Sequence, residues 1–337
     1  MLPARNSRGG ETAMALRTKL TERLGIRHPV LSAPMGSTAG GALAAAVSAA
    51  GGLGLIGGGR LRAGGAGWLE REFAAAGNQR VGCGFITWGL AEQPEMLDVA
   101  LARSPAAIML SFGDAGPFIP RIKNAGIPVI CQVQTVAMAR DVSRQGADII
   151  IAQGGEAGGH GTARRGTLAL VPAIVDMVEA SGRDALVVAA GGIADGRGLA
   201  AALMLGASGV LMGTRFQAAE ESLATSAIKA RLVAGNGDET LRTRIFDIAR
   251  NAPWPAEFTG RALVNRFSET WHGRETELDT QTAEKTRYLE AEVRDDQADA
   301  VVWGGEAIDL IHSVEPAGAI VARIVAEAEA ALARRFD

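Results

Sequence analysis

The sequence predicts an α/β protein built on a (β/α)8 TIM barrel, with an appended, mostly helical subdomain. Eight short runs rich in Val, Ile and Leu alternate with Ala-rich helical stretches along the first two thirds of the chain. Hydrophobic residues make up 47% of the 337 residues, which is enough for a large core. The composition changes after Glu220, where charged residues become frequent. A doubly wound open sheet is the alternative that the same alternation leaves open.

The eight predicted strands follow one another at intervals of 21 to 37 residues. Runs that are apolar on both faces and separated by helices are typical of parallel βα units, and eight such units match a closed barrel. They begin near His28, Leu53, Arg80, Ala106, Ile127, Asp148, Ala185 and Gly209. The longest interval, 37 residues, follows the sixth strand and holds the segment GGEAGGHGTARRG. Because active sites of such barrels lie at the carboxyl ends of the strands, this loop is a functional candidate.

The charged segment after Glu220 predicts a change of architecture. Residues 221–299 carry 11 Lys/Arg and 15 Asp/Glu, or 26 charged residues of 79, against 45 in the other 258. We therefore expect a flexible N-terminal extension over 1–14, a barrel formed by 15–220 plus 300–337, and a charged, mostly helical subdomain over 221–299. The last helix, AGAIVARIVAEAEAALARRF, is amphipathic and should pack back on the barrel.

Composition and charge exclude several classes of partner. The formal net charge is −3 and the pI is about 5.9, so there is no general attraction for nucleic acid or an anionic membrane. Aromatic residues are only 4%, too few for base-stacking platforms. The two cysteines, Cys83 and Cys131, are too few for a disulfide framework or a zinc site and should be inert core thiols. We find neither a run of 18 apolar residues nor the apolar centre of a signal peptide, and expect a cytoplasmic protein.

The glycine-rich loop after the sixth strand, residues 154–161, is the sharpest functional feature. Glycines let the backbone approach a ligand closely and present bare N–H groups to an anion or an electron-rich ring. Among them stands His160, whose imidazole is suited to proton transfer near neutral pH. The alternative is a flexible surface loop that carries a solvated histidine.

Two further glycine turns predict a phosphate site. Ala190–Gly192 ends the seventh strand, and Gly213–Arg215 ends the eighth and opens a short helix. Barrels often bind phosphate with the loops after these two strands and a helix N-terminus. Two ordinary tight turns are the alternative. Asp195 is better interpreted as the N-cap of the following helix than as a catalytic acid.

Soft or polar side chains end other strands. The first strand ends with Ala33–Met35, where the proline frees the chain from ladder pairing. Met35 then offers a polarizable surface to a flat ring, although core packing explains this methionine about as well. Gln132 and Gln153 end the fifth and sixth strands, where an amide can hydrogen-bond a heterocycle or simply be solvated. Phe85, at the end of the third strand, lines either the same pocket or the core.

Together these motifs resemble the nitronate monooxygenase family, formerly called 2-nitropropane dioxygenases, which are FMN-dependent barrels. The resemblance covers about residues 15–337 and is strongest in Ala33-Pro34-Met35, GGEAGGHG, AAGGIADGRGLAAALMLGA and Gly213-Thr214-Arg215-Phe216. It implies that the FMN phosphate lies on the two glycine turns, that the ring lies against the first strand end, and that His160 faces the substrate. The implied flavin contacts are Ala33, Pro34, Met35, Phe85, Gln132, Gln153, Gly159, Ala190, Gly191, Gly192, Gly213 and Thr214.

The resemblance also implies a reaction, in which alkyl nitronates are oxidised through FMN by O2 to carbonyl compounds and nitrite. His160 would position the nitronate, or remove the α-proton of a neutral nitroalkane. Nothing in the sequence requires a metal. Flavin-dependent NADH enoyl-acyl-carrier-protein reductases look much the same in the histidine loop and are the alternative. An FMN-binding protein without efficient turnover is a third interpretation.

One residue departs from the family pattern. Some members have lysine where this chain has Gln132, and a neutral amide would stabilise reduced, anionic flavin less well. The substrate subclass, the use of NADH, the oligomeric state and the role of residues 221–299 therefore stay open at this point.

Overall fold

The predicted barrel is present and closed. The computed structural model describes residues 16–58 and 65–334, so the extension predicted over 1–14 lies outside the described residues. Eight parallel strands form a ring in the order β1-β2-β3-β4-β5-β6-β8-β9, and β9 pairs with β1 to close it. Each of them matches one of the eight predicted runs. The strands are β1 (Val30–Ser32), β2 (Leu53–Gly57), β3 (Gly82–Ile86), β4 (Ile108–Ser111), β5 (Val129–Val133), β6 (Ile149–Gln153), β8 (Leu186–Ala190) and β9 (Val210–Met212).

Two apolar layers result from the alternation of side chains along each strand. One layer fills the barrel, with Leu31, Leu55 and Ile151 among its buried members, and the other packs the strands against the surrounding helices. Leu20 and Leu24 of α1 (Lys19–Leu24) join the inner cluster, so this helix covers the amino ends of the strands. A ligand therefore has to enter at the opposite, carboxyl end.

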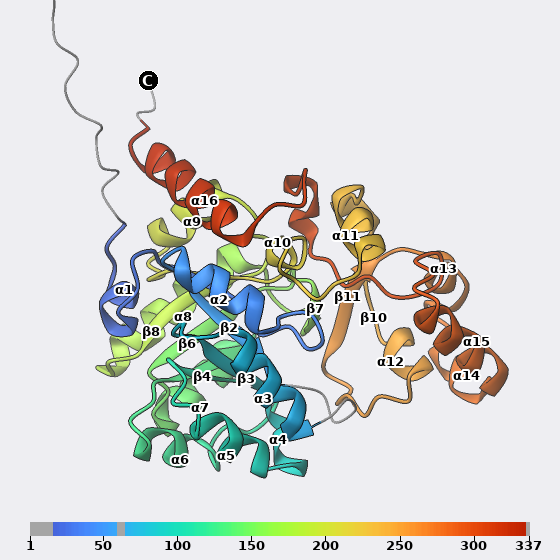
Figure 1. Ribbon diagram of the computed structural model, residues 1–337, viewed down its shortest axis with the longest axis horizontal. Coiled ribbons are helices and arrows are strands. Elements are labelled where there is room, and N and C mark those ends of the chain that lie inside the picture. Colours follow the sequence, from blue (N-terminus) through green and yellow to red (C-terminus); the bar gives the residue numbers. More distant parts are fainter. Residues whose placement is uncertain (1–15, 59–64, 335–337) are drawn as a thin grey trace, which may run out of the picture.

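Helices follow the strands and surround the barrel (Figure 1). The last helix, α16 (Ala317–Leu332), packs on α9 and α2, which confirms the predicted return of the chain to the barrel. In the described ranges no helix is long and apolar enough to cross a membrane. The barrel helices are α2 (Gly41–Ala49), α3 (Gly65–Ala75), α4 (Thr87–Glu92), α5 (Glu95–Leu101), α6 (Ile119–Asn124), α7 (Val136–Gln145), α8 (Thr167–Ser181), α9 (Gly196–Met204) and α10 (Thr214–Gln217).

The glycine-rich loop after β6 contains a strand that the sequence pattern does not reveal. Gly159–Gly161 forms β7, the edge of an antiparallel sheet in the order β10 (Thr240–Thr243), β11 (Thr259–Leu263), β7. His160 lies opposite Gly260 of β11. Three residues rich in glycine carry no strand signal of their own, and this pairing depends on a partner about a hundred residues further along the chain.

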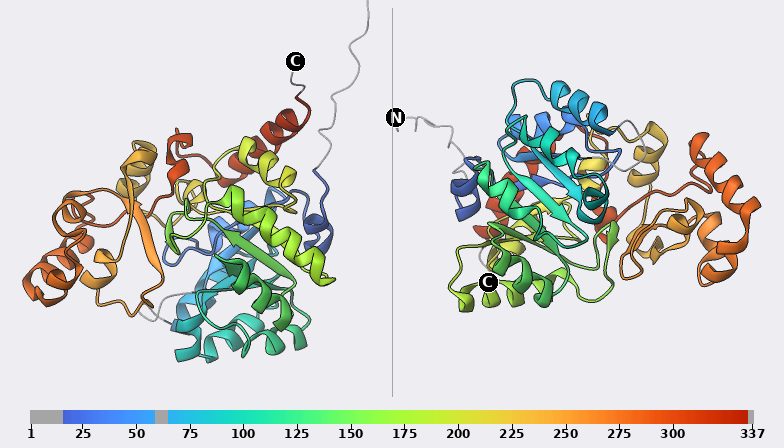
Figure 2. Two further views of the ribbon diagram at one scale, coloured as in Figure 1. Left: turned by 180° about the vertical axis from the view of Figure 1, so that it is seen from behind. Right: turned by 90° about the horizontal axis from the view of Figure 1, so that it is seen from below.

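Residues 221–299 contain these two strands as well as helices, and lie to one side of the barrel (Figure 2). Their buried cluster includes Phe246, Phe267 and Tyr288, and it extends to Val301 beyond the predicted boundary. We propose that this segment and its cluster form the subdomain. Its helices are α11 (Ser226–Val233), α12 (Ile245–Ala249), α13 (Arg266–Trp271), α14 (Glu275–Thr280) and α15 (Thr282–Val293), with the 3-10 turns η1 (Gly237–Glu239) within it and η2 (Glu306–Leu310) after it.

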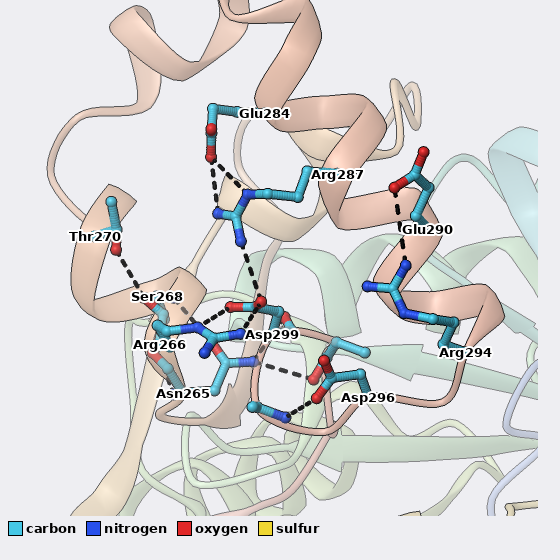
Figure 3. Close-up of polar contacts among 12 residues, drawn as sticks. Asn265, Arg266, Ser268, Thr270, Glu284, Arg287, Glu290, Arg294, Asp296 and Asp299 are labelled. Carbon is cyan, nitrogen blue, oxygen red and sulfur yellow. Dashed lines mark hydrogen bonds and ion pairs between the residues drawn. The ribbon is translucent and has the colours of Figure 1, made fainter.

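An ion-pair network joins α13 and α15 within this segment. Asp299 bonds both Arg266 of α13 and Arg287 of α15, as Figure 3 shows. The hydrogen bond from Arg266 is the main cause of the lowered pKa of Asp299. The network therefore ties two helices to the turn that leads the chain back toward the barrel.

Candidate active site

A cavity of about 240 Å³ opens at the carboxyl ends of the barrel strands. It brings together every predicted site residue except Phe85. Those that line it are Ala33, Pro34, Met35, Gln132, Gln153, Gly159, His160, Ala190, Gly191, Gly192, Gly213 and Thr214. The structure thus places the histidine loop, both glycine turns and the first strand end around one space.

The structure places Phe85 in the core, one of its two alternatives, and corrects the flavin contact that the resemblance implies. Its side chain packs in the outer layer, between β3 and the helices, and borders a neighbouring cavity. The residue of β3 that lines the main cavity is Ile86, one position further on. Because successive side chains of a strand point to opposite faces, an error of one residue reverses the direction.

The two glycine turns form a cradle with unused donors. Gly191 and Gly192 have φ of +102° and +67°, a left-handed conformation that glycine adopts easily. Thr214 is the first residue of α10, where an N–H group has no partner within the helix. Within the described residues, the N–H groups of Gly192 and Thr214 donate to no other group. The predicted cap is confirmed, since Asp195 accepts hydrogen bonds from the backbone of Arg197 and Gly198.

A second pair of glycines closes this cradle from the other side. A Cβ on Gly158 would lie 2.6 Å from the nitrogen of Gly305, and a Cβ on Gly305 would lie 2.8 Å from the nitrogen of Gly158. The Gly305 N–H donates to Oγ1 of Thr214 at 3.1 Å. The segment that returns from the subdomain therefore crosses directly over the histidine loop.

The wall next to β1 is apolar. Pro34 and Met35 both line the cavity, and Pro34 fits because β3 has glycine opposite it: a Cβ on Gly84 would lie 2.3 Å from Cγ of Pro34. Pro34 and Met35 thus offer a soft, apolar surface beside the cradle.

An amide network connects the strand ends to the histidine loop. Oε1 of Gln153 accepts from Nε2 of Gln132 at 3.1 Å and from Nε2 of Gln134 at 2.8 Å. Nε2 of Gln153 donates to the carbonyl of His160 at 3.0 Å. Gln153 is 7% exposed, so it is an ordered, bonded group and not a solvated strand end. Gln134 was not among the predicted residues, and only its neighbours in space reveal its role.

Contacts with residues from beyond the barrel hold His160 in one orientation. Its Nε2 lies 2.8 Å from Oδ2 of Asp247, which belongs to α12. Its ring stacks on the indole of Trp254, with centroids 3.6 Å apart and planes 6° from parallel, and Trp303 lies at 5.0 Å. The side chains of His160 and Asp247 are only 10% and 4% exposed. Because a carboxylate can only accept, Nε2 of the neutral ring carries the proton and Nδ1 is its acceptor nitrogen.

Two arginines of the small sheet hold the histidine loop by its carbonyls. Arg242 of β10 donates to the carbonyls of Gly155, Ala157 and Gly161 at 3.1 to 3.3 Å. Arg261 of β11 donates to Gly155 as well, at 3.1 Å. Burial is the main cause that lowers the pKa of Arg242 to about 10. Both arginines fix the loop backbone and leave the His160 ring to its own contacts.

Asp247, Trp254 and Trp303 are the functional residues that sequence reasoning missed. Asp247 and Trp254 come from residues 221–299, where the charged composition indicates solvated helices, and Trp303 follows just after that segment. Their sequence surroundings, NAPWPA and VVWGGE, give no distinctive signal, since four of the five tryptophans lie beside proline or glycine. Their convergence on His160 depends on the pairing of β7 with β11.

Comparison with known proteins identifies the family of this chain. A family model described as nitronate monooxygenase matches residues 68–327. The chain belongs to this family. A nitronate monooxygenase of Neurospora crassa is 34% identical, over 97% of this chain and 96% of that protein.

Solved structures show the same fold in relatives of the family. FabK from Thermotoga maritima superposes with a TM-score of 0.79 and 30% identity, covering 94% of this chain and 97% of its own. Nitroalkane oxidase from Streptomyces ansochromogenes gives a TM-score of 0.73 and 28% identity, covering 93% and 98%.

Nitronate monooxygenases are flavin-dependent oxidoreductases, and the residues of this cavity fit a flavin. The cradle offers N–H donors to a phosphate, and a side chain at Gly192 would have little room, since its Cβ would lie 3.3 Å from that of Glu156. The apolar wall of Pro34 and Met35 suits a flat ring, and the amide of Gln132 is available to a heterocycle. His160 lines the same cavity.

Proposed function

We propose that the protein oxidises alkyl nitronates with FMN and O2, producing carbonyl compounds and nitrite, and that it also accepts neutral nitroalkanes. The observation that supports this most is the union, in one cavity, of a phosphate cradle with a histidine held between Asp247 and Trp254. Bound FMN would accept electrons from the substrate and pass them to O2. Cytoplasmic location and association into homo-oligomers remain further proposals.

The protein's own part is to orient the substrate and to handle its proton. The bond to Asp247 would keep the proton of His160 on Nε2, and Nδ1 would then be the nitrogen that takes the α-proton of a nitroalkane. The carboxylate then stabilises the imidazolium that forms. With a nitronate the proton is already absent, and the same ring, once protonated, would donate to the anionic substrate. Burial of the pair excludes water from this step.

FMN, and not a dinucleotide, is the flavin we propose. Both glycine turns of the cradle would serve one phosphate, and we find no dinucleotide-binding glycine turn between a strand and a helix that would hold an adenylate. The protein should purify yellow. Heat release followed by mass measurement should yield FMN, and recovery of FAD or of no flavin would contradict the proposal.

The decisive experiment is anaerobic reduction of the bound flavin. We expect ethyl nitronate to bleach it and NADH to leave it oxidised. Bleaching by NADH alone would favour the alternative, an enoyl-acyl-carrier-protein reductase. The similar histidine loop and the fold shared with FabK are the grounds for this alternative. Bleaching by neither would favour a flavin-binding protein without efficient turnover.

A further inference from the structure

A second cavity lies beside the active site, between α4 of the barrel and the loop at residues 250–254 of the subdomain. Its walls include the side chains of Phe85, Trp88, Leu90 and Met96. Phe85, Leu90 and Met96 are buried, with 3 to 6% of their surface exposed. Gln93, Arg250 and Asn251 add polar atoms to the wall, and the apolar side chains favour the transfer of an apolar group from water into the cavity.

The two cavities share a boundary. Ile86 and Trp254 line both of them. Trp254 stacks on His160 on one side, at 3.6 Å, and meets the ring of Trp88 edge-on at 5.3 Å. The second cavity therefore begins one aromatic ring away from His160.

The positive charge of Arg250, at the wall of this cavity, is compensated by Glu292. Arg250 lines the cavity, and its Nε donates to Glu292 at 2.7 Å. The guanidinium also lies 5.6 Å from the ring centre of Trp303 and 5.9 Å from that of Tyr288. With its charge engaged by Glu292, Arg250 gives the cavity little attraction for an anionic group.

We propose that this cavity binds the apolar alkyl or aryl substituent of the substrate and selects nitronates with an uncharged chain of several carbons. The inference rests on the proposed nitronate oxidation. In this proposal Phe85, Leu90 and Met96 contact the substituent and so determine which substrates bind. They take no part in the chemistry at His160.

Gly89 offers a way to fill the cavity. It lies in α4 and lines the cavity, and a Cβ added there would meet no atom within 4 Å. Gly89→Leu should therefore occupy the space without a clash. Gly67→Leu in α3 is the matched control, a helical glycine whose Cβ would meet only the flexible end of Arg71. Met96→Ala has the opposite effect and enlarges the cavity.

The experiment measures kcat/KM for linear nitronates of increasing chain length. In the wild type, kcat/KM should rise about fourfold per methylene until the cavity is full, as expected for about 0.8 kcal/mol per buried CH2. A terminal carboxylate on a chain of equal length should abolish the gain. Gly89→Leu should lose the rise while turning over ethyl nitronate within about twofold of the Gly67→Leu control, and Met96→Ala should move the plateau to longer chains.

Binding of unreactive linear alcohols, followed by quenching of tryptophan fluorescence, separates the two proposals. If no nitronate reduces the flavin, the proposed function fails, and the alcohol series still tests the cavity. The inference would be overturned if neither the affinities nor kcat/KM depended on chain length. It would also be overturned if the Gly89→Leu protein behaved as its Gly67→Leu control does.

Discussion

At the scale of single residues, the site depends on how His160 is constrained. Asp247 fixes which nitrogen carries the proton, and Trp254 fixes the plane of the ring. Gln153 fixes the backbone below it. A base whose orientation is set before the substrate arrives needs little rearrangement during proton transfer.

Replacing His160 with asparagine should separate its two roles. Flavin content should persist, because the free N–H donors of the cradle, on Gly192 and Thr214, lie on other loops. With neutral nitroalkanes kcat/KM should fall about 10²- to 10⁴-fold, the usual contribution of a general base. With preformed nitronates the loss should be smaller, since only positioning is affected. The measurement is kcat/KM for both substrate forms at matched flavin occupancy, and equal activity of variant and wild type would make His160 a structural loop residue.

Asp247→Asn should act through His160. An amide can donate to Nε2 and so stabilise the wrong tautomer, which predicts a loss of about 10²-fold or more with nitroalkanes. Loss of the carboxylate disfavours the imidazolium, so the acid limb of the kcat/KM pH profile should move to lower pH. Asp184→Asn, at an exposed ion pair with Arg23, is the control. An unchanged pH profile in Asp247→Asn would show that the carboxylate only supports the fold.

Sequence reasoning found most side chains of the site but not their partners. His160 and the glycine turns stand at strand ends, where spacing alone places them. The face of Phe85 could not be decided between cavity and core, because the end of a strand is located only to within a residue. Asp247 could not be found, since its contact with His160 depends on tertiary pairing between distant segments.

At the scale of elements, glycine turns build the cofactor cradle. Positive φ at Gly191 and Gly192 turns the backbone after β8, and α10 begins at once after β9. The eight barrel strands were predictable because both their faces are apolar. β7 was not, because its three residues become a strand only through β11.

Gly192→Val should weaken FMN binding about 10- to 100-fold, the size of losing a hydrogen bond or two to a charged group. The valine side chain would be crowded by Glu156 and would stand where the phosphate is expected. Left-handed φ alone costs roughly 1–2 kcal/mol for such a residue. Gly182→Val controls for this strain, with φ of +64° and no atom within 4 Å of the added Cβ. Equal FMN dissociation constants for both variants would place the phosphate elsewhere.

At the scale of the whole molecule, the two thiols are probes of unfolding. Cys83 and Cys131 lie buried in β3 and β5, as predicted. Burial raises the pKa of both, that of Cys131 to about 12, so little reactive thiolate exists in the folded barrel.

Labelling by iodoacetamide should therefore require opening of the barrel and should slow when flavin binds. At an FMN concentration 100 times its dissociation constant, the rate should fall about 100-fold, because binding stabilises the folded state by about 2.7 kcal/mol. A cysteine introduced at exposed Ser181 should react at once with or without FMN. The same labelling rate of Cys83 and Cys131 with and without FMN would show that flavin binding and barrel stability are not linked.

The pairing of β7 with β11 also limits how this protein can be recombined with its relatives. His160 lies opposite Gly260, and a Cβ at Gly260 would come within 2.2 Å of the Trp303 ring. A chimera with its crossover between residues 163 and 239 would take the histidine from one parent and its carboxylate, arginines and tryptophans from the other. Both halves could fold well and still misplace the base. Residues 154–162, 240–263 and 301–306 therefore have to be inherited as one block.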